Sequence, residues 1–351
     1  MRNRRFFIMS EIIIEKGAVV LSVIIKSTAI YHPEHKVNNE ELVEEFKEYG
    51  KDIGYFLDAI GRKDRYLDKQ GAETSVSMAI QATKKLLEKE RIKGREIDTI
   101  VFSSGTPEYI IPANAAFIHK AIQGKPECTV YDMNANCVGM VVAIEQVIRT
   151  MQSNPKIKRA IVVGSEQMSQ YAKKTDEINR GVFGDGACAV LLERTDVMNR
   201  GFIDSAYHTD SVGVEDMRLP GCGLSKAFQA GTSMEDRMIA MISGYQSLRL
   251  APDSKILMEN LLSTHGYTKN DVQRYFISQV SVKAGQLFSQ LLDEKLEKFV
   301  YVGDRYGYTG TSSPLFALHH AIDNELIKER DLFILWSVGA GQTTCGMLFR
   351  R

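Results

Sequence analysis

Cys137 is the residue of this sequence best placed to form a covalent bond with a substrate. It lies in YDMNANCVGM (131–140), between a run typical of a β-strand and an apolar run typical of a helix. The first turn of a helix offers unpaired backbone N–H groups and the positive end of the helix dipole, both of which favour a thiolate. A free cysteine is also among the most buried residue types. Cys137 is therefore either a nucleophile at a helix start or a small core residue.

Four histidines could supply acid–base chemistry, but each has a simpler structural explanation. His265 falls at a predicted helix end, and the adjacent His319 and His320 lie within one helix, where neighbouring positions do not face the same site. His208, near a glycine-rich segment, is the best placed of the four, and the sequence still favours a structural role for it. No spacing of His, Cys, Asp or Glu is typical of a metal site.

The composition limits the classes of protein. The 351 residues predict two domains or one large layered unit. Lys plus Arg and Asp plus Glu each number 44, so we expect binding to neither nucleic acid nor a membrane surface. No apolar run approaches the roughly 20 residues of a membrane-spanning helix. The five cysteines form no CxxC pair and cannot all be paired, which indicates a cytoplasmic protein with free thiols.

Strands and helices alternate in an order that would position Cys137. Apolar runs at 98–104, 128–132, 159–166 and 187–193 predict strands, and their continuous apolarity is typical of buried central strands. Residues 74–89 have the spacing of an amphipathic helix. The helix after Cys137 is apolar on all sides in its first two turns, which predicts that it is buried in the middle of the protein.

The same pattern restarts after about residue 200, which predicts two duplicated α/β halves in a five-layered α/β/α/β/α arrangement. We expect an N-terminal half over 23–200 and a C-terminal half over 201–351. A segment rich in glycine, charge and methionine, 208–238, predicts a cap loop. Residues 1–22 are interpreted as an N-terminal extension, or as the result of a start site placed too early.

Several stretches of the chain resemble one enzyme family. They are STAIYHPEHKVNNEEL, IVFSSGTPEYIIPANAAFIHKAI, DMNANCVGM, IVVGSEQMS, GVFGDGACAVLLE, RYGYTGTSSPLFAL and SVGAGQTTCGMLFR, in this order along the chain. From about residue 23 to its end, the sequence resembles the β-ketoacyl-acyl-carrier-protein synthase III family of the thiolase superfamily.

The resemblance implies a thiolase-like fold and an acyltransferase that acts as a homodimer. Cys137 would accept an acyl group from acyl-CoA or from the phosphopantetheine of an acyl carrier protein, with no permanently bound cofactor and no metal. The backbone N–H groups of Cys137 and Ala340 would form the oxyanion hole. Phe56 lies where many members stack the coenzyme A adenine on a tryptophan, and Lys283 where a basic residue faces the carrier protein.

The chain departs from the family at two positions that serve carbon–carbon bond formation. Ser278, in ISQVS, replaces the histidine of the usual His-Gln-Ala-Asn motif, and Tyr308, in RYGYTGTSS, replaces the asparagine of Gly-Asn-Thr. In the family these groups donate hydrogen bonds to the malonyl thioester and stabilise its enolate. Loss of one preorganised donor costs on the order of 10²–10³ in rate. Standard decarboxylative condensation is therefore disfavoured.

Three functions stay open on the sequence alone. The first is an acyltransferase that loads Cys137 and passes the acyl group to an unidentified acceptor, or condenses it by a non-standard route. The second is a catalytically reduced partner subunit in a heterodimer with an intact synthase paralogue. The third is a standard initiating synthase of fatty-acid synthesis. Retention of Cys137 favours the first over the second, and Ser278 and Tyr308 oppose the third.

Overall fold

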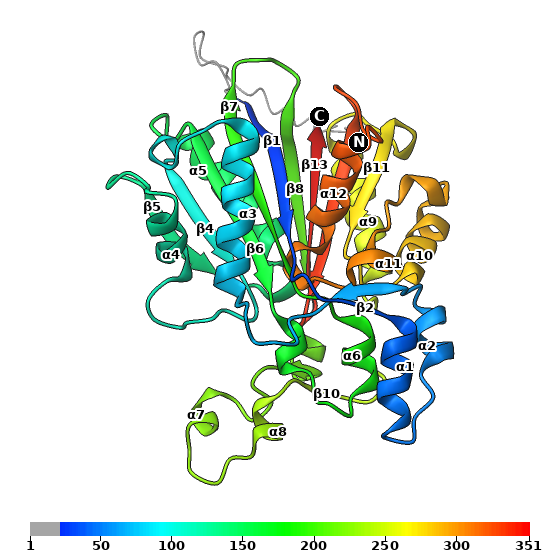
Figure 1. The fold of residues 1–351 in the computed structure, drawn as a ribbon. Helices are drawn as coiled ribbons and strands as arrows, with labels where there is room; N and C mark the ends of the chain where they lie inside the picture. Colours follow the sequence, from blue (N-terminus) through cyan, green and yellow to red (C-terminus); the bar gives the residue numbers. More distant parts are fainter. Residues whose placement is uncertain (1–21) are drawn as a thin grey trace, which may run out of the picture.

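Two mixed β-sheets form the centre of the protein (Figure 1). The computed structural model describes residues 22–351, so the predicted extension lies outside the described residues apart from Ser22. The first sheet has the order β1 (Ser22–Tyr31), β7 (Gly186–Thr195), β6 (Arg159–Glu166), β4 (Thr99–Ser103), β5 (Thr129–Met133). The second has the order β11 (Val272–Ile277), β12 (Leu332–Gly339), β13 (Thr343–Arg350), β8 (Gly201–Thr209).

The two sheets repeat one pairing pattern. β4 pairs parallel with β6, β6 antiparallel with β7, and β7 antiparallel with β1. In the second sheet β11, β12, β13 and β8 pair in the same senses and the same order. This repeat confirms the predicted duplication of two α/β halves. The chain passes from the first sheet to the second between Thr195 and Gly201.

Six helices complete the layers around the sheets (Figure 1). Helices α3 (Ser75–Glu90) and α4 (Asn114–Ala121) cover the outer face of the first sheet. Helices α9 (Ala251–Thr264) and α10 (Val282–Leu292) cover the outer face of the second. Helices α5 (Gly139–Ser153) and α12 (Ser313–Asp323) pack in one core between the sheets. The predicted five-layered arrangement is confirmed.

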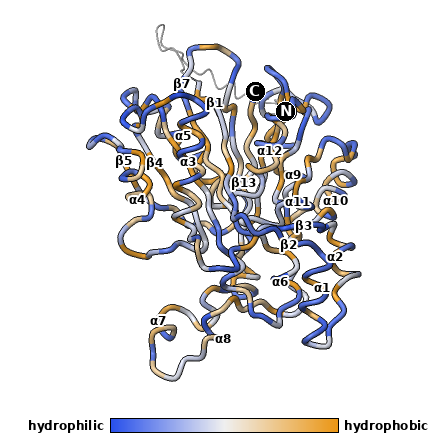
Figure 2. The backbone as a smooth tube through the Cα atoms, viewed as in Figure 1, coloured by the Kyte–Doolittle hydropathy of each residue, from blue (hydrophilic) through white to orange (hydrophobic). Residues whose placement is uncertain are grey.

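The helices predicted from the sequence form for identifiable local reasons. Thr74 caps α3: its hydroxyl accepts from the Ser77 N–H, and the Ser77 hydroxyl accepts from the Thr74 N–H. α5 buries most of its residues, as its apolar first turns predict. Figure 2 shows hydrophobic residues along β4 in the interior, whereas the surface helix α1 (Asn39–Lys47) is mainly hydrophilic.

Strand β5 differs from its prediction as a buried central strand. It lies at the edge of the first sheet, where β4 is its only partner strand within residues 22–351, and Thr129 and Asp132 are exposed. The Asp132 carboxylate accepts hydrogen bonds from the N–H groups of Asn114 and Ala115 at the start of α4. The predicted strand at 128–132 is confirmed, but the prediction that it is a central strand is wrong. The apolar content of a run does not determine how many strands pair with it.

The remaining elements surround the ends of the strands near Cys137. One group has its own small core and contains α1, α2 (Gly54–Ala59), β2 (Lys36–Asn38) and β3 (Asp64–Tyr66). Residues 208–238, predicted as a cap loop, contain β9 (Met217–Arg218), α7 (Leu224–Ala227) and α8 (Met234–Arg237), with β10 (Ala240–Met241) just beyond. Helices α6 (Glu177–Val182) and α11 (Gly303–Tyr306) complete the structure. Within residues 22–351, no helix is long and apolar enough to cross a membrane.

Candidate active site

Cys137 lies in a tight turn directly before the central helix. β5 ends at Met133, a 3₁₀ turn spans Asn136–Val138, and α5 begins at Gly139. Asn136 has a φ of 54°, a left-handed conformation that asparagine tolerates better than most residues. The half-buried thiol is therefore next to the start of α5 rather than within its first turn.

Two glycines allow the segments around this turn to approach closely. A Cβ on Gly139 would lie 2.6 Å from Ser103 Oγ at the end of β4, and one on Gly339 would lie 2.8 Å from the Ala135 carbonyl oxygen. Thr311 Oγ1 accepts the Met140 N–H at 2.7 Å, which satisfies one of the first N–H groups of α5. The turn is thus held between the ends of β4 and β12.

The end of β12 brings Ala340 to the Cys137 thiol. The backbone N–H groups of Cys137 and Ala340 lie near enough to the Cys137 sulfur to lower the pKa of the thiol. Asn136 Nδ2 donates to the Ala340 carbonyl oxygen at 3.1 Å, which ties the two loops together. Cys137 and Ala340, which are 203 positions apart in the sequence, therefore present their N–H groups to the same sulfur.

Tyr308 contacts the same sulfur with its side chain. Its N–H donates to the Val182 carbonyl oxygen at 2.9 Å and its carbonyl accepts the Gly184 N–H at 3.1 Å, so the backbone is fixed against residues 182–184. The ring is buried in the same cluster as Cys137, and its hydroxyl acts on the thiol as a donor that lowers the pKa. Burial, and then the charge and hydrogen bond of Cys137, raise the pKa of Tyr308 well above its usual value. Tyr308 therefore acts as a donor at neutral pH.

Burial outweighs these donors at Cys137. Loss of water raises the pKa of the thiol to about 11, and the charge of Glu166 acts in the same direction. At this thiol, burial therefore opposes the effect expected from the helix start. The free-energy cost of desolvating a buried thiolate is larger than the stabilisation that the three donors provide.

Ser278 lies beside the nucleophile turn but does not face it. Its Oγ lies 2.8 Å from Ser337 Oγ, and Ser337 Oγ donates to the Cys137 carbonyl oxygen at 2.7 Å. A hydroxyl has a single proton, so Ser278 must be the donor to Ser337. The N–H of Val338 lies 3.4 Å from Ser278 Oγ. Because the single proton of the Ser278 hydroxyl is donated to Ser337, it is not available to a substrate.

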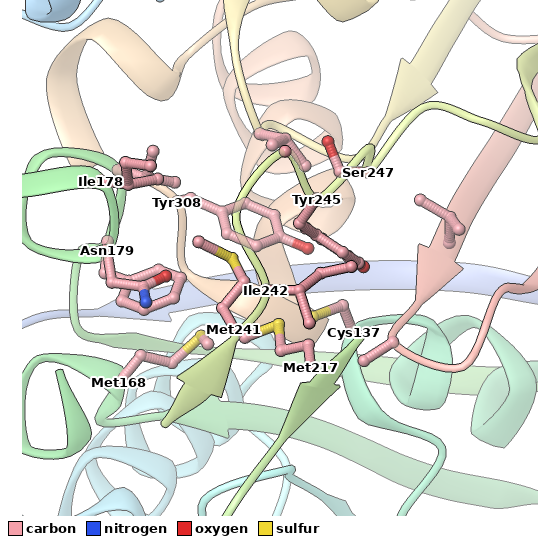
Figure 3. A pocket seen from close by; sticks show the side chains of 16 residues that line it. Cys137, Met168, Ile178, Asn179, Met217, Met241, Ile242, Tyr245, Ser247 and Tyr308 are labelled. Carbon is pink, nitrogen blue, oxygen red and sulfur yellow. The ribbon is translucent and has the colours of Figure 1, made fainter. Parts of the chain in front are cut away.

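Two cavities open onto Cys137. The first, of about 190 Å³, is here named the apolar cavity (Figure 3). Besides Cys137, Tyr308 and Ala340 it is lined by Met168, Ile178, Asn179, Val182, Phe183, Met217, Met241, Ile242, Gly244, Tyr245, Ser247, Val280 and Val338. Five of these side chains, those of Met217, Met241, Ile242, Tyr245 and Ser247, come from the predicted cap and the loop after it. The sequence analysis singled out none of these five residues. Ser278 lines neither cavity.

The second cavity, here named the polar cavity, has about 90 Å³ and lies on another side of the thiol. It shares Cys137, Ala340, Met168 and Met217 with the apolar cavity. Its other lining residues are Gly105, Thr106, Asn134, Asn136, Glu166, Arg218, Leu219 and Ile239. Cys137 can therefore be reached from two sides of different polarity.

The sequence of this site matches a known family. Residues 131–211 match the family described as 3-Oxoacyl-[acyl-carrier-protein (ACP)] synthase III, and residues 262–351 match its C-terminal domain. The β-ketoacyl-[acyl-carrier-protein] synthase III of Koribacter versatilis is 27% identical over 298 residues, which are 84% of this chain and 89% of that protein. The chain belongs to the 3-oxoacyl-[acyl-carrier-protein] synthase III family. The synthase III of Wolbachia pipientis wMel is 27% identical over 320 residues, 91% of this chain and 96% of that protein.

Solved structures of a synthase III protein and of OleA share the fold of this chain. The 3-oxoacyl-(acyl carrier protein) synthase III of Pseudomonas aeruginosa superposes with a TM-score of 0.84 at 20% identity, covering 94% of this chain and 98% of that one. OleA of Xanthomonas campestris gives a TM-score of 0.78 at 17% identity, covering 95% and 99%. These likenesses confirm the thiolase-like fold that the motifs predict.

Phe56 and Lys283, the predicted donor contacts of this synthase III homologue, lie outside both cavities. Phe56, in α2, packs against Gly181 in α6, where a Cβ would lie 2.8 Å from its ring. Lys283 is exposed at the start of α10, and the neighbouring Val282 N–H donates to the Ile60 carbonyl oxygen just after α2. The structure therefore brings the two segments together beside α6, which forms part of the wall of the apolar cavity.

None of the four candidate histidines lines the polar or the apolar cavity. His265 Nε2 lies 2.9 Å from an Asp204 carboxylate oxygen, and His319 Nδ1 lies 3.0 Å from Thr28 Oγ1. His320 contacts Asn324, and the His208 carbonyl accepts from Thr344 in the second sheet. No histidine within residues 22–351 therefore stands in for the one that the family motif contains.

Arg62 is a residue of this site that the sequence did not reveal. It is 1% exposed, and its five N–H donors meet five uncharged acceptors at 2.6–3.2 Å. These are the Val182, Gly303, Gln279 and Val280 carbonyl oxygens and the Tyr301 hydroxyl. The Val182 carbonyl also accepts the Tyr308 N–H. Arg62 thus fixes the wall that carries Val182, Val280 and Tyr308, but nothing in the run GRKDR distinguishes it from its basic neighbours.

Proposed function

We propose that this synthase III homologue is an acyltransferase in which Cys137 accepts an acyl group from a thioester and passes it to an acceptor. The observation that carries the proposal is the position of Cys137 and Ala340, which both line the two cavities. The N–H groups of these residues and the hydroxyl of Tyr308 act on the same thiol. In an acyl-enzyme the two N–H groups would serve the carbonyl oxygen, as an oxyanion hole does.

The donor in this proposal is acyl-CoA or an acylated carrier protein. The apolar cavity leads from Cys137 towards α6, next to the segments of Phe56 and Lys283. A structure of Xanthomonas campestris OleA, which has the same fold, is described with bound lauroyl-CoA. That likeness supports a thioester donor in this chain but does not decide between the two carriers.

Standard condensation with a malonyl thioester is not part of the proposed function. The Ser278 proton is used by Ser337, and Ser278 borders neither cavity. Tyr308 supplies one hydroxyl where the family has an amide, and its ring occupies space beside Cys137. Without preorganised donors, an enolate loses stabilisation worth on the order of 10²–10³ in rate.

We further propose a cytoplasmic homodimer. The five cysteines are free thiols, which fits a reducing compartment. Near the edge strand β5, the loop before α4 exposes Tyr109, Ile110 and Ile111, with 43%, 67% and 85% of their surface accessible. An open strand edge beside exposed apolar residues is a suitable surface for a second copy of the chain.

Intact-protein mass spectrometry tests the proposed activity. The protein is incubated with a panel of acyl-CoA and acyl-carrier-protein thioesters, and the wild type is compared with Cys137→Ala and Cys222→Ala. Cys222 is a half-buried free thiol outside both cavities, and so a matched control. We expect an acyl adduct on the wild type and on Cys222→Ala but not on Cys137→Ala. No adduct from any donor would contradict the proposal and favour the role of a partner subunit.

A further inference from the structure

Tyr245 brings a second phenol hydroxyl to the apolar cavity, and the proposed acyl transfer does not yet use it. The ring lines this cavity together with Cys137 and Tyr308, and Figure 3 shows the two tyrosines on the same side of the thiol. Burial and then the charge of Cys137 raise the pKa of Tyr245 to about 12, so the two groups are neighbours and the hydroxyl is protonated at neutral pH. No hydrogen bond of this hydroxyl is found within residues 22–351. It can therefore accept a proton from one group in the cavity while it donates its own to another.

The turn after β10 fixes Tyr245 in this position. The Ile242 N–H donates to the Asp216 carbonyl oxygen at 2.9 Å, and the Tyr245 N–H donates to the Ile242 carbonyl oxygen at 3.3 Å. Gly244, the third residue of this turn, has a φ of 80°, a left-handed conformation that favours glycine. The turn directs the Tyr245 side chain to the cavity, whereas the next residue, Gln246, is exposed.

Acyl loading in the apolar cavity requires a proton transfer. Among the described residues that line this cavity there is no His, Asp, Glu, Lys or Arg, and the titratable ones are Cys137, Tyr245 and Tyr308. Burial raises the pKa of the Cys137 thiol to about 11, so the thiol must give up a proton when its sulfur attacks a thioester. The sulfur that leaves an alkyl thioester must gain one, because a weakly acidic thiol leaves slowly as its anion. Tyr308 acts on the Cys137 sulfur as a donor, which leaves Tyr245 as the group that can move the proton.

We propose that Tyr245 is a catalytic residue that carries the proton of Cys137 to the leaving thiol during acyl loading. This inference rests on the proposed acyl-enzyme at Cys137. The Cys137 sulfur forms a bond to the thioester carbon as its proton passes to the Tyr245 oxygen, and the carbonyl electron pair moves to the carbonyl oxygen. That pair returns as the bond between the carbon and the donor sulfur breaks, and the donor sulfur takes the Tyr245 hydroxyl proton. The products are the Cys137 thioester, the free thiol of the donor and an unchanged tyrosine.

Leaving groups of different acidity separate this role from a structural one. The same acyl group is offered on N-acetylcysteamine, an alkyl thiol, and on thiophenol, whose more acidic sulfur departs without a proton. Loading of Cys137 is followed by mass spectrometry at pH 9, where a fraction of the thiol is ionised, and alkylation by iodoacetamide, which releases iodide, is measured alongside. We expect Tyr245→Phe to load from the N-acetylcysteamine thioester on the order of 10²-fold more slowly than wild type. Its loading from the thiophenol thioester should stay within about threefold, and its alkylation should be unchanged.

Tyr171→Phe is the matched control. It also removes one phenol hydroxyl from the apolar cluster around Cys137, but Tyr171 lines neither cavity. Its variant should react with all three reagents within about twofold of the wild-type rates.

Three results with Tyr245→Phe would overturn the proposal. Equal slowing with both thioesters would indicate a steric role, and wild-type loading from both would indicate that no proton passes through this hydroxyl. Slower alkylation together with a lowered melting temperature would indicate a structural role. A wild-type protein that reacts with iodoacetamide but forms no acyl adduct would instead overturn the acyltransferase itself, and this inference with it.

Discussion

The hydroxyl oxygens of Ser278 and Ser337 lie 2.8 Å apart, and this contact directs Ser278 away from the substrate space. Ser337 in turn donates its own hydroxyl proton to the Cys137 carbonyl oxygen. The position that holds a catalytic histidine in the family motif therefore helps to fix the backbone of the nucleophile turn in this chain.

Ser278→Ala should leave acyl loading nearly unchanged. The substitution removes one buried hydrogen bond, worth about 1 kcal/mol of unfolding free energy, and no donor to the cavities. We expect a loading rate within about twofold of wild type and a small loss of stability in urea denaturation. A tenfold slower loading, with stability retained, would show that Ser278 reaches the thioester after all.

Tyr308→Phe should make Cys137 less reactive at a given pH. The Tyr308 hydroxyl stabilises the thiolate, so its removal raises the thiol pKa further above about 11. Below that pKa the thiolate fraction rises tenfold for each pH unit, and at pH 7 it is on the order of 10⁻⁴. We expect iodoacetamide to modify Cys137 roughly three- to tenfold more slowly at pH 9 in the variant. Faster modification would indicate that the ring shields the sulfur more than its hydroxyl activates it.

Tyr171→Phe provides the control for that measurement. Tyr171 packs in the same apolar cluster as Tyr308 and Cys137, but it is not among the groups that act on the pKa of the thiol. Its variant should show the wild-type dependence of modification rate on pH. An equal effect of both substitutions would point to a general loosening of the cluster.

The order of the layers could be predicted because buried strands and helices differ in periodicity. The continuous apolar runs of β6 and β7 and the apolar start of α5 are properties of local sequence. The edge position of β5 was missed, since no local pattern counts neighbouring strands. The residues of the site show the same limit. Motifs predicted Cys137, Tyr308 and Ala340. The orientation of Ser278 depends instead on a contact with Ser337, 59 positions away in the sequence, which no motif contains.

Arg62 illustrates what sequence patterns do not contain. Its acceptors are mainly backbone carbonyls, which every residue has, and they belong to segments 120, 217 and 241 positions away. Arg62 is buried and its neighbour Lys63 is exposed, and this difference arises only when these segments meet around Arg62.

Arg62→Met should destabilise the protein strongly. The substitution leaves several buried carbonyls without a donor, and each such group costs about 1–3 kcal/mol. We expect the unfolding free energy in urea to fall by at least about 3 kcal/mol, and by less in Arg62→Lys, which keeps the charge and some of the donors. Arg95→Met, at an exposed position, should change it by less than about 0.5 kcal/mol. Equal stability of Arg62→Met and Arg95→Met would mean that water replaces the guanidinium.

Lys283→Glu should distinguish a carrier-protein donor from coenzyme A. Lys283 is exposed at the start of α10, near the segment of Phe56, so it can meet an acidic protein without altering the cavities. If an acyl carrier protein is the donor, reversal of this charge should slow loading from it by about tenfold at low salt, and the difference should fade as ionic strength rises. Loading from the uncharged acyl-pantetheine should not change.

Lys295→Glu, just beyond the other end of α10, makes the same charge reversal at an exposed position and is the control. Equal effects of the two variants would reflect net charge alone, and no effect of Lys283→Glu would exclude this lysine from carrier-protein docking.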